Sequence, residues 1–95
     1  MNKKICVVVP SYMVKGHLLN VVESIPDFVD KIYIIDDKCP EGSGKYIAEN
    51  CHDSRVFVHF HDENLGVGGA VMTGYRCAIS DGMDVVVKID GDGQM

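Results

Sequence analysis

Residues 4–9 read Lys-Ile-Cys-Val-Val-Val and are followed at once by Pro10. A short apolar run rich in β-branched residues is typical of a strand buried on both faces, and we expect the proline to end it. A second run of the same kind, Ile-Tyr-Ile-Ile at residues 32–35, closes on Asp36 and Asp37. Strands of this type occur mainly in parallel sheets with helices on both faces. The two runs therefore predict an α/β fold.

The rest of the chain continues the alternation between strand and helix patterns. The expected elements are, in order, a helix over residues 18–25 that Pro26 ends, a loop over residues 38–44, a short helix over residues 45–50, a strand over residues 55–60, a helix from about residue 64 to residue 80, and a strand over residues 85–89. The order βαβαβαβ predicts one parallel sheet with right-handed crossovers. In such sheets the chemistry gathers at the carboxyl ends of the strands.

Length and composition favour one small globular domain over residues 1–95. The formal net charge of -5 opposes binding to nucleic acid or to an anionic membrane surface. No apolar run approaches the ~18 residues of a membrane span, and the stretch before Pro10 is too short for a signal-peptide core. The cysteines form no C-x-x-C pair and are expected to be reduced. We therefore expect a cytoplasmic protein without a nucleic-acid partner.

Cysteine and histidine side chains in the middle of the chain allow a second interpretation. Cys51, His52, His59 and His61 lie close together in the sequence, which makes a zinc site conceivable. No standard zinc-ligand spacing is present, however. The favoured interpretation places His59 and His61 on the open face of the third strand.

Acidic residues follow three of the four expected strands. The residues at the strand ends are Pro10, Ser11 and Tyr12, then Asp36 and Asp37, then Asp62, Glu63 and Asn64, and finally Asp90 and Asp92. Like charges gathered at one edge repel each other unless a cation or a hydrogen-bonding ligand joins them. We therefore expect a divalent cation at this edge rather than direct binding of phosphate.

The segment Asp90-Gly91-Asp92 is the sharpest candidate for that cation site. Two carboxylates just past a strand can lean toward one hard cation, and the glycines let the backbone turn around it. Gln94 adds a neutral oxygen at the next alternate position. Mg²⁺ or Mn²⁺ held in this way keeps open positions for substrate phosphates. The alternative is a plain acidic turn, because Asp and Gly are common turn residues.

Asp36 and Asp37, at the end of the second strand, also allow two interpretations. A carboxylate in this position can accept hydrogen bonds from a base or a ribose laid across the strand ends. It can equally cap a helix or a turn of the loop that follows. The residue types alone favour neither.

Residues 64–70, Asn-Leu-Gly-Val-Gly-Gly-Ala, open a helix after a strand. They do not complete the G-x-G-x-x-G spacing of a dinucleotide-binding loop, because residue 71 is valine. Ala70, Gly74 and Ala78 repeat at every fourth position, which predicts a helix packed closely on the sheet. Asn64 is placed to act as a helix cap.

Four of these segments together resemble the amino-terminal half of the family 2 glycosyltransferases, a large group of inverting enzymes with nucleotide-sugar donors. The matching segments are residues 7–12 with the Pro-x-Tyr turn, residues 34–37 with Asp-Asp, residues 64–78, and residues 86–94 with D-x-D. The last has the form seen in polyprenyl-phosphate sugar transferases. The resemblance spans essentially the whole chain. It implies the Rossmann-like, nucleotide-binding half of a GT-A type fold, with a sheet order of 3-2-1-4.

The resemblance also implies roles for individual residues. The nucleotide-binding residues would be Pro10, Tyr12, Asp37 and Asp90. The ligands of Mg²⁺ or Mn²⁺ would be Asp90, Asp92 and Gln94. The donor would be a nucleotide-diphosphate sugar of the UDP or GDP type. The acceptor would be a lipid phosphate or a polysaccharide. The reaction would serve the synthesis of cell-surface polysaccharide or glycolipid. The full-length parent would work in the cytoplasm or at the inner membrane face.

No residue of the chain matches the family's catalytic general base, which is expected beyond Met95. We therefore interpret residues 1–95 as a truncated nucleotide-sugar-binding domain that is inactive alone. The alternative function is a non-catalytic nucleotide-binding or interaction module that kept the fold. The fourth strand would lie at a sheet edge with Lys88 as the only charge inside it. Such an edge predicts a homo-oligomer paired through this strand.

Overall fold

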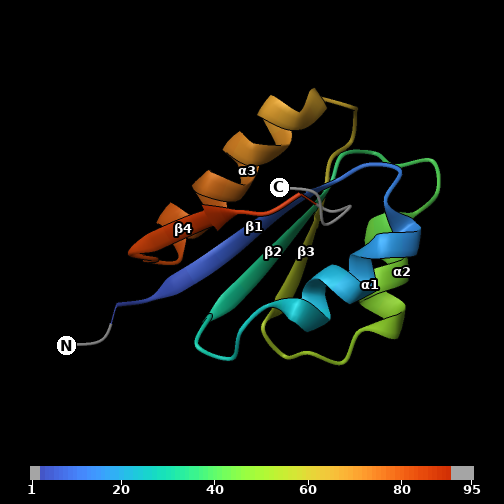
Figure 1. The fold of residues 1–95 in the computed structure, drawn as a ribbon. Coiled ribbons are helices and arrows are strands. Elements are labelled where there is room, and N and C mark those ends of the chain that lie inside the picture. The colour runs from blue at the N-terminus through green and yellow to red at the C-terminus, as the bar shows by residue number, and fades with distance from the viewer. Residues whose placement is uncertain (1–2, 91–95) are drawn as a thin grey trace.

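Four parallel strands and three helices follow one another in the computed structural model, which describes residues 3–90 (Figure 1). The elements are β1 (Ile5–Ser11), α1 (Lys15–Ser24), β2 (Lys31–Asp36), α2 (Ser43–Asn50), β3 (Val56–Phe60), α3 (Gly66–Ser80) and β4 (Val85–Lys88). The predicted α/β class and the βαβαβαβ order are confirmed.

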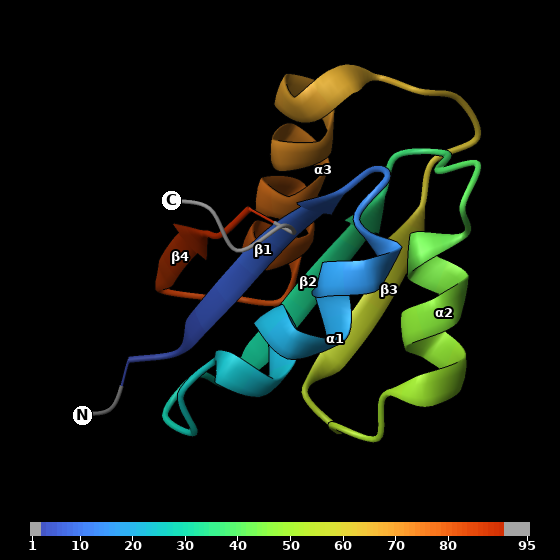
Figure 2. The same ribbon diagram turned by 45° about the vertical axis from the view of Figure 1, so that its right-hand side comes forward.

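The strands pair in the order β3-β2-β1-β4, all of them parallel. Helices α1 and α2 lie on one face of the sheet and α3 lies on the other, as Figure 2 shows. The expected order 3-2-1-4 is therefore confirmed, with β1 and β2 in the centre. β4 pairs with β1 along Ile5↔Val85 to Val8↔Lys88 and lies at one edge.

β1 does not end at Pro10, as the sequence had suggested, but continues to Ser11. The reason lies in the direction of the backbone groups. The carbonyl of Ser11 accepts from the Asp37 N–H on the β2 side, and the carbonyl of Val8 accepts from the Ile89 N–H on the β4 side. The alternation turns Pro10 toward β4, beyond the last pair of that ladder at Val8. A proline is tolerated in a strand where no ladder donor is required.

Two helices begin earlier than their sequence patterns indicated. α1 begins at Lys15 rather than Leu18, because its first turn is polar and exposed and carries no apolar period. α2 begins at Ser43 rather than Lys45. Its start is held by the carboxylate of Asp36, which accepts a hydrogen bond from the Gly44 N–H at 2.8 Å. Patterns of apolar residues do not report such contacts from another element.

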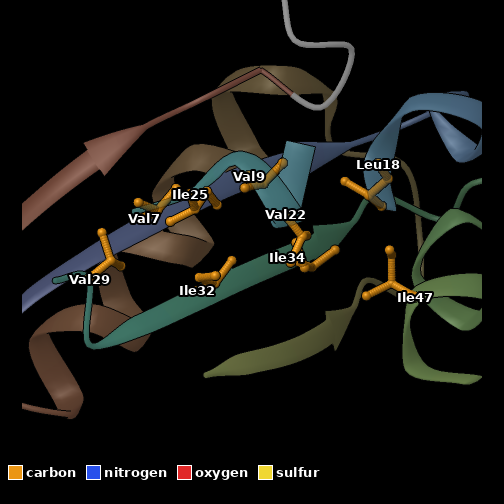
Figure 3. Close-up of a cluster of buried hydrophobic side chains, with 9 residues drawn as sticks. All are labelled: Val7, Val9, Leu18, Val22, Ile25, Val29, Ile32, Ile34 and Ile47. Atoms are coloured by element: carbon orange, nitrogen blue, oxygen red, sulfur yellow. The ribbon is translucent and has the colours of Figure 1, made fainter. Parts of the chain in front are cut away.

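The larger core cluster fills the space between the sheet and helices α1 and α2 (Figure 3). Its buried side chains are Val7, Val9, Leu18, Val22, Ile25, Val29, Ile32, Ile34 and Ile47. Burying one such aliphatic side chain contributes about 1.5–3 kcal/mol. This cluster therefore fixes β1 and β2, whose carboxyl ends carry the candidate residues Pro10, Tyr12 and Asp37.

Helix α3 lies very close to β1 on the opposite face. Ala70, Gly74 and Ala78 are its buried residues, and a Cβ placed on Gly74 would lie 2.2 Å from Cγ1 of Val8. The close packing predicted from the row of small residues is confirmed. It places the beginning of α3 beside the ends of β1 and β2.

Arg55, just before β3, stabilises the connection between α1 and β2 through hydrogen bonds. Its guanidinium donates to the carbonyls of Pro26 at 2.7 Å, Val29 at 3.3 Å and Ile25 at 3.4 Å. It is itself paired with Asp53, with a shortest N–O distance of 2.7 Å. One side chain thus satisfies several carbonyls of a loop at the end of the sheet opposite the candidate site.

Within residues 3–90, no helix combines the length and the apolar content that a membrane crossing requires.

Candidate functional site

A cavity of about 570 Å³ opens at the carboxyl ends of the strands. Pro10, Tyr12, Asp37 and Asp90 all line it, together with residues at the start of α3 that include Asn64, Gly66 and Val67. The structure therefore brings together the four residues that the resemblance singled out for nucleotide binding, although they come from three different strand ends.

The position of this cavity follows from the topology. The chain leaves β1 toward α1 on one face of the sheet and leaves β3 toward α3 on the other face (Figure 2). The loops at this end of the sheet therefore diverge and leave a crevice between the β1–α1 loop and the start of α3. Open α/β sheets bind their ligands at such a switch point.

Asp37 is the buried acid of this cavity and accepts hydrogen bonds from two other elements. Its Oδ1 accepts from the Leu65 N–H at 2.8 Å and lies 2.8 Å from Nδ1 of His61. Its Oδ2 accepts from the Gly66 N–H, also at 2.8 Å. Asp37 therefore caps the start of α3 and also lines the cavity, whereas the loop that follows β2 is held by Asp36.

These hydrogen bonds control the charge of Asp37. Burial opposes its ionisation, but the Leu65 N–H, His61 and the Gly66 N–H outweigh burial and hold the pKa of Asp37 below its ordinary value. The carboxyl group is therefore ionised at neutral pH and acts only as an acceptor. A carboxylate offers about four acceptor positions, and these contacts use three of them.

Asp36 has a structural role on the opposite face. Its Oδ1 accepts from the Cys39 N–H at 2.7 Å and its Oδ2 from the Gly44 N–H at 2.8 Å. The approach is so close that a Cβ on Gly44 would lie 2.7 Å from the Asp36 side chain. Asp36 therefore holds the loop before α2, and it is not among the residues that line the cavity.

The loop after β1 carries the aromatic wall of the cavity. Tyr12 is 45% exposed, and the following Met13 has a left-handed φ of 59°. The Met13 N–H donates to Sγ of Cys39 at 3.2 Å, and the Val14 N–H donates to Oγ of Ser43 at 3.4 Å. The start of α2 and the loop before it thus hold this loop in place.

Asp90 lies at the end of β4 with its carboxylate 3.0 Å from Nζ of Lys88. The other two predicted metal ligands, Asp92 and Gln94, lie outside the described residues. Within residues 3–90, no three His, Cys, Asp or Glu side chains are grouped as metal ligands. Of the acidic strand ends in this range, Asp37 and Asp90 line the cavity, and no third acidic side chain joins them there.

The same finding bears on the zinc interpretation, since Cys51, His52, His59 and His61 are all described and form no such group. His61 is also not on an open strand face, as had been expected. Its side chain is 6% exposed and lies between Asp37 and Thr73. This role could not be predicted from the sequence, because nothing in an alternating strand pattern shows that α3 covers the residue after β3.

Two curated relatives match most of this chain. It is 31% identical over 107 residues to the UDP-N-acetylglucosamine--dolichyl-phosphate N-acetylglucosaminyltransferase of Methanococcus voltae, covering 98% of this chain and 43% of that protein. It is 29% identical over 100 residues to the undecaprenyl-phosphate mannosyltransferase of Micrococcus luteus, covering 95% of this chain and 38% of that protein. The chain thus spans less than half the length of each relative.

A solved structure shares the fold. The mannosyltransferase PcManGT from Pyrobaculum calidifontis, in complex with GDP-Man and Mn²⁺, superposes with a TM-score of 0.74 at 22% identity, covering 97% of this chain and 28% of that one. The prediction of a GT-A type fold is therefore confirmed. The family model described as Glycosyl transferase family 2 matches residues 6–95. The chain belongs to glycosyl transferase family 2.

Proposed function

We propose that residues 1–95 form a single domain that binds the nucleotide-sugar donor of a glycosyltransferase. The observation that carries the proposal is the cavity that gathers Pro10, Tyr12, Asp37 and Asp90. Its volume of about 570 Å³ falls within the range of small-molecule sites, ~300–1,000 Å³. The donor would be a nucleotide-diphosphate sugar of the UDP or GDP type.

The chemistry of the lining supports this ligand class. Asp37 is ionised and keeps one acceptor position of Oδ2 for a donor group of a base or a ribose. Pro10 and Tyr12 offer apolar surface on which a ring can pack. The N–H groups of Leu65 and Gly66, at the start of α3, are already bonded to Asp37, so these two groups are not offered to a phosphate.

We propose a divalent cation beside the diphosphate, and Asp90 fits it. Its side chain is 41% exposed at the cavity and presents hard carboxylate oxygens. Mg²⁺ commonly uses one or two protein carboxylates together with substrate phosphates and water. We propose Asp90, Asp92 and Gln94 as the ligands of Mg²⁺ or Mn²⁺. When bound, the cation would offset the charge of the departing nucleotide.

The names of the relatives suggest the acceptor. One is named for transfer to dolichyl phosphate and the other for undecaprenyl phosphate. We propose a polyprenyl phosphate as the acceptor of the full-length protein, rather than a growing polysaccharide. Such a lipid is held in a membrane, so the protein would act at the cytoplasmic face of that membrane.

The test of donor binding is calorimetry of the chain with GDP and with UDP, each in the presence and absence of MnCl₂. Asp92→Ala should weaken the Mn²⁺-dependent binding by more than about tenfold. The matched control is Asp27→Ala, because Asp27 is exposed in the turn before β2, at the other end of the sheet. Asp81 would be a poor control, because it accepts from the Tyr33 hydroxyl at 2.5 Å and pairs with Lys31.

Equal effects of the two substitutions would show that the D-x-D segment is only a turn. Absence of nucleotide binding by the unaltered chain would contradict the proposed function. It would favour the alternative, an interaction module that kept the fold.

We further propose that this chain pairs with a second copy through β4. Among the residues that the structure describes, the strand has a partner on one side only, and its side chains Val85 and Val87 are 37% and 42% exposed. Lys88 is the one charge within the strand, and it is partly neutralised by Asp90 at 3.0 Å. An apolar strand edge with so little charge favours pairing with the same strand of another chain.

Sedimentation at tens of micromolar tests this association. The unaltered chain should form dimers or larger species, and Val87→Lys should form monomers, because a lysine on an edge strand opposes pairing. The control is Ile79→Lys, which changes a residue that is 77% exposed on α3. A folded, monomeric unaltered chain would contradict the proposal.

A further inference from the structure

Three side chains from different elements form one hydrogen-bonded row behind the cavity wall. Nδ1 of His61 lies 2.8 Å from Oδ1 of Asp37, and Nε2 of His61 lies 2.7 Å from Oγ1 of Thr73. Asp37 follows β2, His61 follows β3, and Thr73 lies in the middle of α3. The row therefore joins two strand ends to the helix that borders the cavity.

The row is enclosed by protein. The side chains of His61 and Asp37 are 6% and 4% exposed. His59 packs edge-on against His61 with ring centroids 5.7 Å apart, and the His61 backbone N–H donates to the carbonyl of Asp36. Both the ring and the backbone of His61 are thus fixed in place.

The partners determine where the protons lie. An ionised Asp37 can only accept, so Nδ1 of His61 must carry a proton toward it. In the neutral imidazole, Nε2 is then the acceptor and the Thr73 hydroxyl is the donor. A threonine hydroxyl can satisfy this arrangement, whereas a valine of the same shape cannot.

We propose that His61, oriented by Thr73, is a positioning residue that holds the Asp37 carboxylate in the orientation required for nucleotide binding. The inference rests on the proposed function and extends it to two residues that do not line the cavity. Without the N–H of His61, Asp37 would keep its bonds to Leu65 and Gly66 but lose the partner on the side of β3.

Asn and Gln replacements separate this role from mere filling of space. The amide of Asn in His61→Asn can reach Asp37 in place of Nδ1, whereas the longer side chain of His61→Gln places its amide nearer Thr73. We expect His61→Gln to weaken Mn²⁺-dependent binding of GDP or UDP by about tenfold, the effect of losing one hydrogen bond to a charged group. We expect His61→Asn to recover most of that loss. Thr73→Val should weaken nucleotide binding less than His61→Gln does. Thr73→Ser keeps the hydroxyl group and should bind nucleotide as the unaltered chain does.

The binding measurements use calorimetry with GDP and UDP in MnCl₂, with urea unfolding of each variant to monitor stability. His59→Gln is the matched control, because His59 packs against His61 and is not among the partners of Asp37. A second measurement needs no variant. Nitrogen-15 NMR of the unaltered chain without metal should show the neutral His61 ring protonated at Nδ1 rather than Nε2.

The outcomes distinguish this inference from the proposed function. If the unaltered chain binds neither nucleotide, the proposed function fails and this inference fails with it. If the chain binds nucleotide and His61→Gln binds as tightly, only this inference is overturned. It is also overturned if His61→Asn and His61→Gln lose affinity equally, or if the NMR spectrum shows the proton on Nε2.

Discussion

Replacing Gly74 with alanine tests how tightly α3 is packed on the sheet. The added Cβ would lie 2.2 Å from Cγ1, 2.9 Å from Cγ2 and 3.1 Å from Cβ of Val8. Val8 is fully buried in the central strand, and its β-branched side chain has little rotamer freedom. The helix must therefore move away from the sheet or the strand must distort.

The magnitude follows from two opposing effects. Alanine is favoured over glycine within a helix by about 1 kcal/mol. Overpacking a core costs about 1–3 kcal/mol, and the three short contacts place this substitution at or above the upper end. We expect Gly74→Ala to lower the free energy of unfolding by about 2 kcal/mol. Domains of this size have about 5–15 kcal/mol in total, so the loss should be clear in urea unfolding followed by circular dichroism.

The same helix supplies a control in Gly68→Ala. A Cβ at Gly68 would have no atom within 4 Å, so this variant should be as stable as the unaltered chain or more stable. The double variant Val8→Ala with Gly74→Ala should show a favourable coupling of about 1–2 kcal/mol, because the smaller side chain makes room for the new methyl group. Equal stabilities of the Gly74 and Gly68 variants would refute the packing argument.

Three further outcomes are expected. In the folded chain the pKa of Asp37 lies below its ordinary value of 3.8. Ionised Asp37 therefore stabilises the fold above that pH, and this stabilisation is lost as the pH falls through the folded-state pKa. Asp37→Asn should therefore reduce the difference in unfolding free energy between pH 6 and pH 3, and an unchanged difference would contradict this assignment. Arg55→Lys should lower the free energy of unfolding in urea by about 1–3 kcal/mol, because lysine cannot reach the same carbonyls together, whereas Arg76→Lys on the exposed side of α3 should have little effect. Residues 1–95 alone should transfer no sugar from a radiolabelled donor to a polyprenyl phosphate with Mn²⁺, and turnover that Asp92→Ala abolishes would show that this expectation is wrong.

The arrangement of the sheet could be predicted from the sequence because its determinants are local. The β-branched runs at β1 and β2 are buried on both faces, so their composition alone identified them. The row of Ala70, Gly74 and Ala78 predicted the close approach of α3, since only small side chains allow it. The sheet order came from the family resemblance rather than from the pattern.

The hydrogen bonds of the site could not be predicted in the same way. Asp36 and Asp37 are adjacent in sequence, yet they cap helices on opposite faces because successive side chains of a strand alternate. The partners of Asp37 lie 24 to 29 residues away, and no local pattern links them to it. His61 was misplaced for this reason: an alternating pattern predicts which side chains share a face, but not what covers that face.

The pairing of β1 with β4 has a consequence for synthesis of the chain. Of the four described strands, β1 is synthesised first and lies in the centre of the sheet, yet its neighbour β4 is synthesised after the other three, and the Lys4 N–H donates to the carboxylate of Asp84 across a separation of 80 residues. While the nascent chain grows, β1 can pair with β2, but its other edge stays unpaired until β4 has been synthesised. Folding should therefore be completed late, with an apolar strand edge open to chaperones or to neighbouring nascent chains in the meantime.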